Sequence, residues 1–347
     1  MLVSEFDYAL PAELIAQAPS ERGSARMLVL ERATGRIRHA HVGALPEFLA
    51  PGDLVVVNNT RVFPARLRGH RVPSGGAVQC LLLHRLDRER WDALVHPGQK
   101  LGPGARMRFG GAGGLLEAEV LERTFHGRRV IRLLAPEGGD IETIIDRIGH
   151  VPLPPYIKRA DTPFDRERYQ TVFASRRGSV AAPTAGLHFT PDLVRALETT
   201  GIGRAEITLH VGYGTFKPVR VEQAEDHVVD AEAFEIAAAA ARAIDRTLAA
   251  GRRVVAVGTT TTRALESADV GRPAGARPAT GVTDLVIVPG FRFGVVGALL
   301  TNFHLPRSSL LMLVCAFGGT ERVLAAYREA VDRRYRFYSY GDCMLIT

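Results

Sequence analysis

Cysteine is scarce in this chain of 347 residues: only Cys80, Cys315 and Cys343 occur, and they lie far apart. An odd number of scattered cysteines argues against a disulfide framework and against a zinc site, and it is typical of proteins from a reducing compartment. We therefore expect a cytoplasmic protein that contains no metal.

Long apolar stretches and a secretory signal are also missing. One of the longest apolar runs, residues 310–317, is far shorter than the ~20 residues that a membrane helix needs. The first nine residues are acidic and mixed, and they lack the basic and apolar regions of a signal peptide. We expect neither secretion nor a membrane partner.

The motifs of several common enzyme classes are absent. The sequence contains no G-x-x-x-x-G-K-[ST] phosphate loop, no H-E-x-x-H and no C-x-x-C. The glycine-rich residues 110–114 do not fit the dinucleotide fingerprint and lie between two predicted strands, so we interpret them as a hairpin turn. These absences argue against a nicotinamide-dependent enzyme and against a P-loop enzyme.

Lysine is rare as well, although the chain is basic. The formal net charge is +7 and 44 residues are Lys or Arg, but only three are lysines: Lys100, Lys158 and Lys217. Arginine binds phosphate through two parallel hydrogen bonds, so this bias favours a nucleic-acid partner. A GC-rich genome would produce the same bias, and the composition alone leaves both explanations open.

The pattern of apolar residues divides the chain into two parts. Within residues 62–153, short alternating runs separated by Gly and Pro turns predict strands at 65–72, 77–86, 90–96, 115–122 and 128–134, followed by a helix at 140–148. Such spacing is typical of a small antiparallel barrel or sandwich. The flanking parts predict alternating strands and helices, which indicates an α/β domain with an inserted β module. Their predicted strands are 54–57, 206–211, 253–257 and 285–288, and their predicted helices are 193–199, 236–250, 264–268, 310–317 and 322–333.

Four segments are unusually polar for their apolar surroundings. Residues 58–66 contain two arginines five positions apart, which could hold a carboxylate or a phosphate, although the Asn and Thr residues could simply form a turn. Residues 182–190 precede a helix that begins after Thr190, and they include His188 as a candidate acid or base. Both segments are therefore candidates for a binding site.

The other two polar segments also precede helices. Residues 257–263 contain four consecutive threonines after Gly258, and their hydroxyl and N–H groups suit a ribose or a carboxylate. Residues 301–309 precede an apolar helix that Ser308 or Ser309 caps. His210 is followed by two glycines within a few residues, and residues 337–342 place aromatic rings around an acid. His210 could also be a core histidine, and the rings could simply pack a strand.

Together these segments closely resemble one family, the S-adenosylmethionine:tRNA ribosyltransferase-isomerases. The resemblance covers nearly the whole chain, from Phe6 to Asp342. Its most specific stretches are residues 58–67, 152–157, 168–172, 181–189, 208–216, 257–267 and 301–317. The resemblance implies a mixed-sheet α/β main domain, residues 1–61 and 154–347, with an inserted antiparallel β-barrel of about six strands at residues 62–153.

The resemblance also implies one reaction. The ribosyl part of S-adenosylmethionine moves to the aminomethyl group of 7-aminomethyl-7-deazaguanine at the wobble position of tRNA and isomerises, which gives epoxyqueuosine and releases adenine and methionine. S-adenosylmethionine is then a consumed substrate, tRNA is the partner, and no further cofactor is expected.

This chemistry requires a base, an acid and a site for both substrates. Our candidates for catalysis are His188, His210, His304 and Asp342. Our candidates for substrate binding are Asn59, Arg61, Arg66, Tyr156, Thr184, Gly258, Thr259, Thr260, Arg263, Asn302 and Tyr340.

The chain departs from the family pattern at two positions. The family commonly reads His-x-Met-His-x-Glu where this chain retains His227 and Glu232 but has Asp230 in place of the second histidine. Tyr213 stands where a small or aliphatic residue is usual. If the missing histidine carries a proton, the pH dependence or the substrate should differ here.

Two other functions compete with this reading. One is an RNA-binding protein of the same fold without activity, and the other is an S-adenosylmethionine-dependent methyltransferase. The polar segments argue against the first, and the lack of a glycine-rich loop after the first strand argues against the second.

Overall fold

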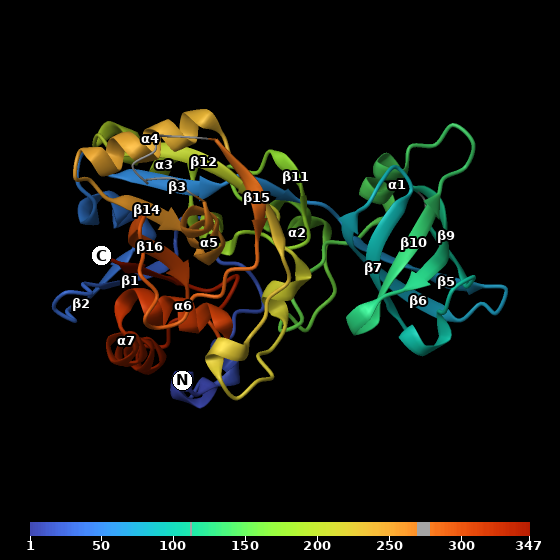
Figure 1. Ribbon diagram of the computed structural model, residues 1–347, viewed down its shortest axis with the longest axis horizontal. Coiled ribbons are helices and arrows are strands. Elements are labelled where there is room, and N and C mark those ends of the chain that lie inside the picture. Colours follow the sequence, from blue (N-terminus) through green and yellow to red (C-terminus); the bar gives the residue numbers. More distant parts are fainter. Residues whose placement is uncertain (112, 269–277) are drawn as a thin grey trace.

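The computed structural model describes residues 1–111, 113–268 and 278–347. Figure 1 shows two bodies: a larger one in which helices cover a twisted sheet, and a smaller β-barrel at the other end of the molecule. Both chain ends lie on the larger body.

A nine-stranded mixed sheet forms the centre of the larger body, in the order β15-β13-β12-β3-β14-β16-β17-β1-β2. Its strands are β1 (Arg26–Leu30), β2 (Ile37–His41), β3 (Leu54–Asn58), β12 (Gly203–Leu209), β13 (Glu232–Ile236), β14 (Val254–Val257), β15 (Ala279–Thr283), β16 (Val296–Asn302) and β17 (Cys343–Ile346). The four strands β12, β3, β14 and β16 are parallel. Every residue of β3 and β14 is buried, as expected for parallel strands that have helices on both faces.

Helices cover both faces of this sheet (Figure 1). They are α3 (Pro191–Thr199), α4 (Ala238–Ala249), α5 (Thr259–Ser267), α6 (Ser309–Gly318) and α7 (Thr320–Asp332), while the short helix α2 (Pro163–Arg168) lies between the sheet and the barrel. The side chains of Thr190 and Ser308 cap α3 and α6 by accepting hydrogen bonds from backbone N–H groups. In the described part of the chain no single helix is long and apolar enough to cross a membrane; α6 and α7 meet that test only as a pair, and the chain bends by 115° between them.

The smaller body is a closed barrel in the order β10-β7-β6-β5-β8-β9. Its strands are β5 (Arg66–Val72), β6 (Ala77–Arg85), β7 (Arg90–His96), β8 (Arg106–Gly111), β9 (Gly114–Arg123) and β10 (Arg128–Leu134), and α1 (Ile141–Ile148) packs against β9. Alternate residues such as Leu82, Trp91 and Phe109 fill its interior. Closure leaves none of these six strands with a free edge.

Two short strands and several ion pairs join the barrel to the main body. β4 (Thr60–Val62) pairs with β11 (Arg176–Ser179) at the junction. On the barrel, Arg128 donates to Asp230 of the main body at 2.7 Å, and Lys217 approaches the same carboxylate at 2.8 Å. Asp230, which departs from the family pattern, is therefore held between two cations that neutralise it.

The predicted fold class is confirmed: the chain folds into an α/β body with a six-stranded antiparallel barrel. β7 and β10 have the predicted limits. α1 begins one residue later than predicted, because Asp140 caps it from outside. The glycine-rich hairpin is confirmed by the pairing of Gly111 with Gly114, while Ala112 lies outside the described residues.

Some predicted elements are wrong. Residues 285–288 are apolar but form no strand, and the carbonyl oxygen of Leu285 accepts a hydrogen bond from Arg263. The sequence analysis did not predict β8. Only Met107 and Phe109 point inward in this strand, and the arginines and glycines around them hide the alternating pattern. Residues 259–263 belong to α5 itself and not to a loop before it.

Candidate functional site

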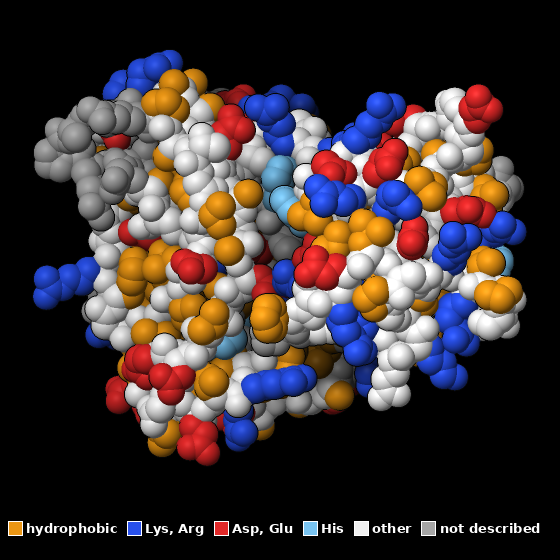
Figure 2. Space-filling view, turned by 45° about the vertical axis from the view of Figure 1, so that its right-hand side comes forward, with side chains coloured by type: hydrophobic (Ala, Val, Ile, Leu, Met, Phe, Trp, Pro, Cys, Tyr) orange, Lys and Arg blue, Asp and Glu red, His pale blue; other side chains and the backbone are white. Residues whose placement is uncertain are grey.

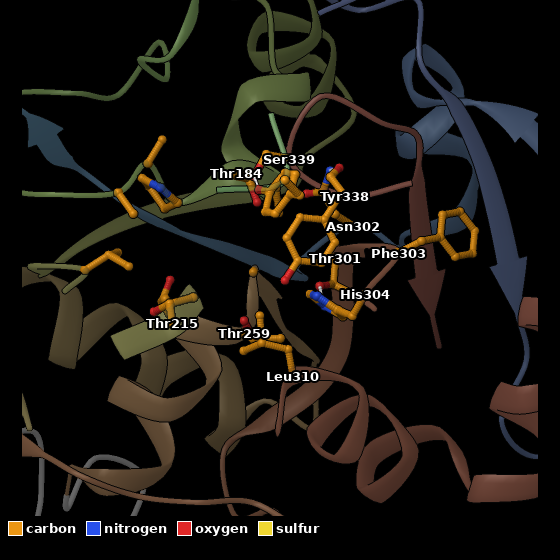
Figure 3. A pocket seen from close by; sticks show the side chains of 18 residues that line it. Thr184, Thr215, Thr259, Thr301, Asn302, Phe303, His304, Leu310, Tyr338 and Ser339 are labelled. Atoms are coloured by element: carbon orange, nitrogen blue, oxygen red, sulfur yellow. Dashed lines mark hydrogen bonds between the residues drawn. The ribbon is translucent and has the colours of Figure 1, made fainter. Parts of the chain in front are cut away.

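A pocket of about 530 Å³, including its open mouth, lies at the carboxyl ends of β14 and β16. Four segments line most of it: residues 181–185, 258–260, 301–304 and 338–339. Ligands of open α/β sheets commonly bind at this end of the parallel strands. Figure 3 shows Thr184, Ser339, Tyr338 and Asn302 on one side, with Thr215, Thr259 and Leu310 on the other.

The start of α5 forms one wall. Gly258 has a φ of 93°, a backbone conformation that favours glycine, and its N–H group donates to the carbonyl oxygen of Leu300 at 2.8 Å. This turn brings the first N–H groups of α5 to the pocket, where a helix has no partners of its own for them. Thr260 is 6% exposed, and its Oγ1 has no hydrogen-bond partner among the described residues. A ligand oxygen or N–H group would supply the missing partner.

The end of β16 forms the opposite wall. The Asn302 side-chain Nδ2 donates to the Tyr338 carbonyl oxygen at 3.0 Å and lies 3.2 Å from Nε2 of His188. Asn302 is 2% exposed, and its Oδ1 has no partner within the described residues. A second buried acceptor is thus available to a bound molecule.

His304 is held firmly in this pocket. Its Nε2 lies 2.9 Å from Oγ1 of Thr301, and its backbone N–H group donates to the hydroxyl oxygen of Tyr327 at 3.1 Å. The Tyr8 hydroxyl donates to the His304 carbonyl oxygen at 2.5 Å. Burial lowers the pKa of His304 to about 3, so its imidazole is neutral at pH 7.

The same effect makes the fold sensitive to acid. Burial lowers the pKa of His188 to about 4, and both histidines have an ordinary pKa of 6.5. Between these pKa values the unfolded chain binds protons that the folded chain does not bind. The free energy of unfolding should therefore fall as the pH drops from 6.5 towards 4, by up to about 1.4 kcal/mol per pH unit for each histidine. Urea unfolding at several pH values measures this. The variants His188→Gln and His304→Gln should each show a shallower decline, and profiles parallel to that of the wild type would contradict the assignment.

Seven of the predicted site residues lie together in this pocket. They are Tyr156, Thr184, Gly258, Thr259, Thr260, Asn302 and His304. His188 does not line the pocket but contacts Asn302, and it lines a neighbouring cavity of about 280 Å³ together with Tyr340.

Arg263 lies behind the pocket. Its Nη1 donates to the Glu232 carboxylate at 2.6 Å, and its other donors bond the carbonyl oxygens of Leu285 and Thr283. It lines a second cavity of about 430 Å³ that shares Thr215 with the first. The structure therefore makes Arg263 part of a buried ion pair at the back of the pocket, and three of its five N–H donors bond to groups of the protein.

Asp342 also lies outside the pocket. Its carboxylate accepts hydrogen bonds from the backbone N–H groups of Arg26, at 2.9 Å, and Arg336, at 2.8 Å, and from the Arg26 guanidinium at 3.2 Å. These donors reach both oxygens, so Asp342 stabilises the chain around it.

Two other candidates lie on the side of the sheet that faces the barrel. Nδ1 of His210 is 2.8 Å from Oγ1 of Thr60, and burial lowers the pKa of His210. The Asn59 side chain bonds Glu206 at 3.2 Å. Neither residue lines the pocket.

The remaining candidates lie near the junction with the barrel or beyond the pocket wall. Arg61 is exposed on β4, and Nη2 of Arg66 donates to the carbonyl oxygen of Leu153 at 3.2 Å. The Tyr340 hydroxyl donates to Asp165 at 3.0 Å.

The predicted residues omit several that line the pocket: Thr215, Thr301, Leu310, Tyr338 and Ser339. All except Leu310 are polar, and each lies in a segment that the sequence marks as unusual or as part of the resemblance. The sequence does not show which of the neighbouring tyrosines, 338 or 340, faces the pocket, because a turn has no side-chain period. Within the described ranges, no group of three or more His, Cys, Asp or Glu side chains is arranged to hold a metal ion.

Known proteins similar to this chain agree on one family. Residues 3–346 match the family described as queuosine biosynthesis protein. The S-adenosylmethionine:tRNA ribosyltransferase-isomerases of Heliobacterium modesticaldum and Aquifex aeolicus are each 50% identical to this chain, with both chains covered completely. The crystal structure of S-adenosylmethionine tRNA ribosyltransferase from Thermotoga maritima is 39% identical with a TM-score of 0.56, and the match covers 99% of this chain and 100% of that one.

The resemblance drawn from the sequence motifs is thereby confirmed over almost the whole chain. This chain belongs to the family of queuosine biosynthesis proteins that includes the S-adenosylmethionine:tRNA ribosyltransferase-isomerases.

Proposed function

We propose that this enzyme transfers the ribosyl part of S-adenosylmethionine to the aminomethyl group of 7-aminomethyl-7-deazaguanine at the tRNA wobble position and isomerises it. The products are tRNA carrying epoxyqueuosine, adenine and methionine. The observation that carries the assignment of the site is the pocket itself. It brings His304 together with two buried oxygens, on Thr260 and Asn302, that have no hydrogen-bond partner among the described residues. Family membership supports the reaction.

His304 is suited to move the proton that this reaction releases. The sulfonium of S-adenosylmethionine acidifies the neighbouring C5′–H bond, and a neutral imidazole accepts that proton. Burial lowers the pKa of His304 to about 3, so the neutral imidazole is a weak base and the imidazolium, once formed, gives its proton up readily. The departing adenine takes it. Oγ1 of Thr301, 2.9 Å from Nε2, orients the ring for both steps.

The substrate groups also find complementary surroundings. We propose that the start of α5 binds oxygen atoms of S-adenosylmethionine through its N–H groups and the Thr259 and Thr260 hydroxyls. No further cofactor takes part, since the sulfonium leaving group drives the reaction.

The RNA approaches from the side of the barrel in this proposal. Figure 2 shows histidine and basic side chains where the two bodies meet. Arg61 is exposed at this junction and can bind a phosphate. The cytoplasm, where tRNA is modified, is the expected place of action.

Product analysis tests the proposed function. Incubation with S-adenosylmethionine and tRNA that carries the deazaguanine precursor should release adenine and methionine in equal amounts. The same tRNA without the precursor base is the control and should release neither. Formation of S-adenosylhomocysteine would indicate a methyltransferase instead, and RNA binding without any product would indicate an inactive RNA-binding protein.

A further inference from the structure

The turn at residues 336–341 holds Tyr338 in an unusual backbone conformation. Its φ is 74°, in the left-handed region that side chains other than glycine rarely adopt. Such a conformation persists only where the surroundings enforce it, and it is common at ligand sites. Tyr338 is also one of the residues that line the pocket.

The surroundings of the turn fix it at several points. The Tyr338 N–H group donates to the Phe303 carbonyl oxygen at 3.1 Å, and the Tyr338 carbonyl oxygen accepts from Gly341 at 2.9 Å and from Asn302 at 3.0 Å. A Cβ atom at Gly341 would lie 2.4 Å from the Arg336 carbonyl oxygen, so only glycine fits there. These contacts fix the backbone of Tyr338 in the left-handed conformation, and this conformation directs its side chain to the pocket.

A neighbouring aromatic ring, which also lines the pocket, holds the ring of Tyr338 in place. The Tyr156 ring packs against it edge-on, with centroids 3.8 Å apart and an interplanar angle of 82°. Burial raises the pKa of Tyr338 to about 12, so its ring stays uncharged near pH 7. Next to it, the Asn302 side chain holds the Tyr338 carbonyl oxygen, and its own Oδ1 has no hydrogen-bond partner in the part of the chain that the structure describes. Figure 3 shows these two side chains on the same side of the pocket.

We propose that Tyr338 is the surface on which a purine-type base of the substrate stacks, while Oδ1 of Asn302 accepts a hydrogen bond from an N–H group of that base. The inference rests on the proposed function, which supplies two such bases: adenine of S-adenosylmethionine and deazaguanine of the RNA. A flat ring and a fixed acceptor are the two elements with which proteins commonly recognise an unpaired base.

Glycine is the informative replacement, because it removes the ring and also accepts a φ of 74° without strain. Because the buried ring also packs against Tyr156, Tyr338→Gly should lower the melting temperature, and the relief of backbone strain should offset only part of that loss. The affinity of this variant for one of the two substrates should fall about 5- to 150-fold, the range found when an aromatic ring that stacks on a base is removed. Tyr338→Phe keeps the ring and should restore the affinity.

The matched control is Arg334→Gly. Arg334 has a φ of 54° and is exposed, so this variant makes the same backbone change away from the pocket. Titration calorimetry with S-adenosylmethionine and filter binding with the precursor tRNA measure the two affinities separately. A loss confined to S-adenosylmethionine places adenine on Tyr338, and a loss confined to tRNA places deazaguanine there.

Unchanged affinities for both substrates in Tyr338→Gly would overturn the proposal, and so would an equal loss in Tyr338→Phe. Failure of the wild type to release adenine and methionine would reject the proposed function itself. The two failures are therefore distinguishable.

Discussion

Replacing Arg263 with alanine is expected to lower the free energy of unfolding by about 3–5 kcal/mol, because it leaves a carboxylate buried without its partner. Glu232 is 4% exposed and lies 2.6 Å from the guanidinium, and burial already raises its pKa. Urea unfolding at pH 7 measures the loss. Protonation removes the buried charge, so the difference from the wild type should shrink at lower pH.

The control is Arg333→Ala, which breaks an exposed pair with Glu329 and should cost no more than about 1 kcal/mol. A double variant, Glu232→Gln with Arg263→Met, should recover much of the stability because no unpaired charge remains. If Arg263→Ala instead kept its stability and raised the KM for S-adenosylmethionine, the role expected from the sequence would be correct after all.

His304→Gln is expected to reduce turnover about 10²- to 10⁴-fold, the usual contribution of a group that transfers a proton in the transition state. Glutamine keeps a polar group of similar size beside Thr301, so the fold should persist. Single-turnover release of adenine measures the effect, and thermal unfolding verifies the fold.

His39→Gln provides the comparison for this variant. His39 bonds Tyr335 near the protein surface and lies outside the pocket, so turnover should remain near that of the wild type. Near-normal turnover in His304→Gln would show that His304 only packs the pocket wall, and another group would then have to carry the proton.

The sequence predicts the barrel better than it predicts the site. β7 and β10 alternate strictly between inward and outward residues, so their limits follow from the pattern. A run of four threonines gives no such signal. The structure makes it the first turn of α5, where the Thr261 and Thr262 hydroxyls bond the carbonyl oxygens four residues earlier.

The candidate site shows the same limit. Arg263 is a cation in a polar segment, which suggests that it binds a ligand. Its partner is Glu232, 31 residues away, and nothing in the sequence reveals that pairing. Of the two predicted tyrosines, Tyr156 lines the pocket and Tyr340 lines a neighbouring cavity, while the left-handed conformation at Tyr338 turns that residue to the pocket. Pairings between distant segments and local backbone reversals are properties of the folded chain, and a single sequence does not display them.

The position of β17 has a consequence for how the protein is made. This strand comes last in the sequence but lies inside the sheet, between β16 and β1. Arg26 and Asp342, which meet beside it, are 316 residues apart. The β1–β2 hairpin therefore leaves the ribosome long before its neighbour exists, and its unpaired edge is open to wrong partners during translation. Contacts this distant also form slowly. We expect the nascent chain to need protection by chaperones until residues 343–346 have been synthesised.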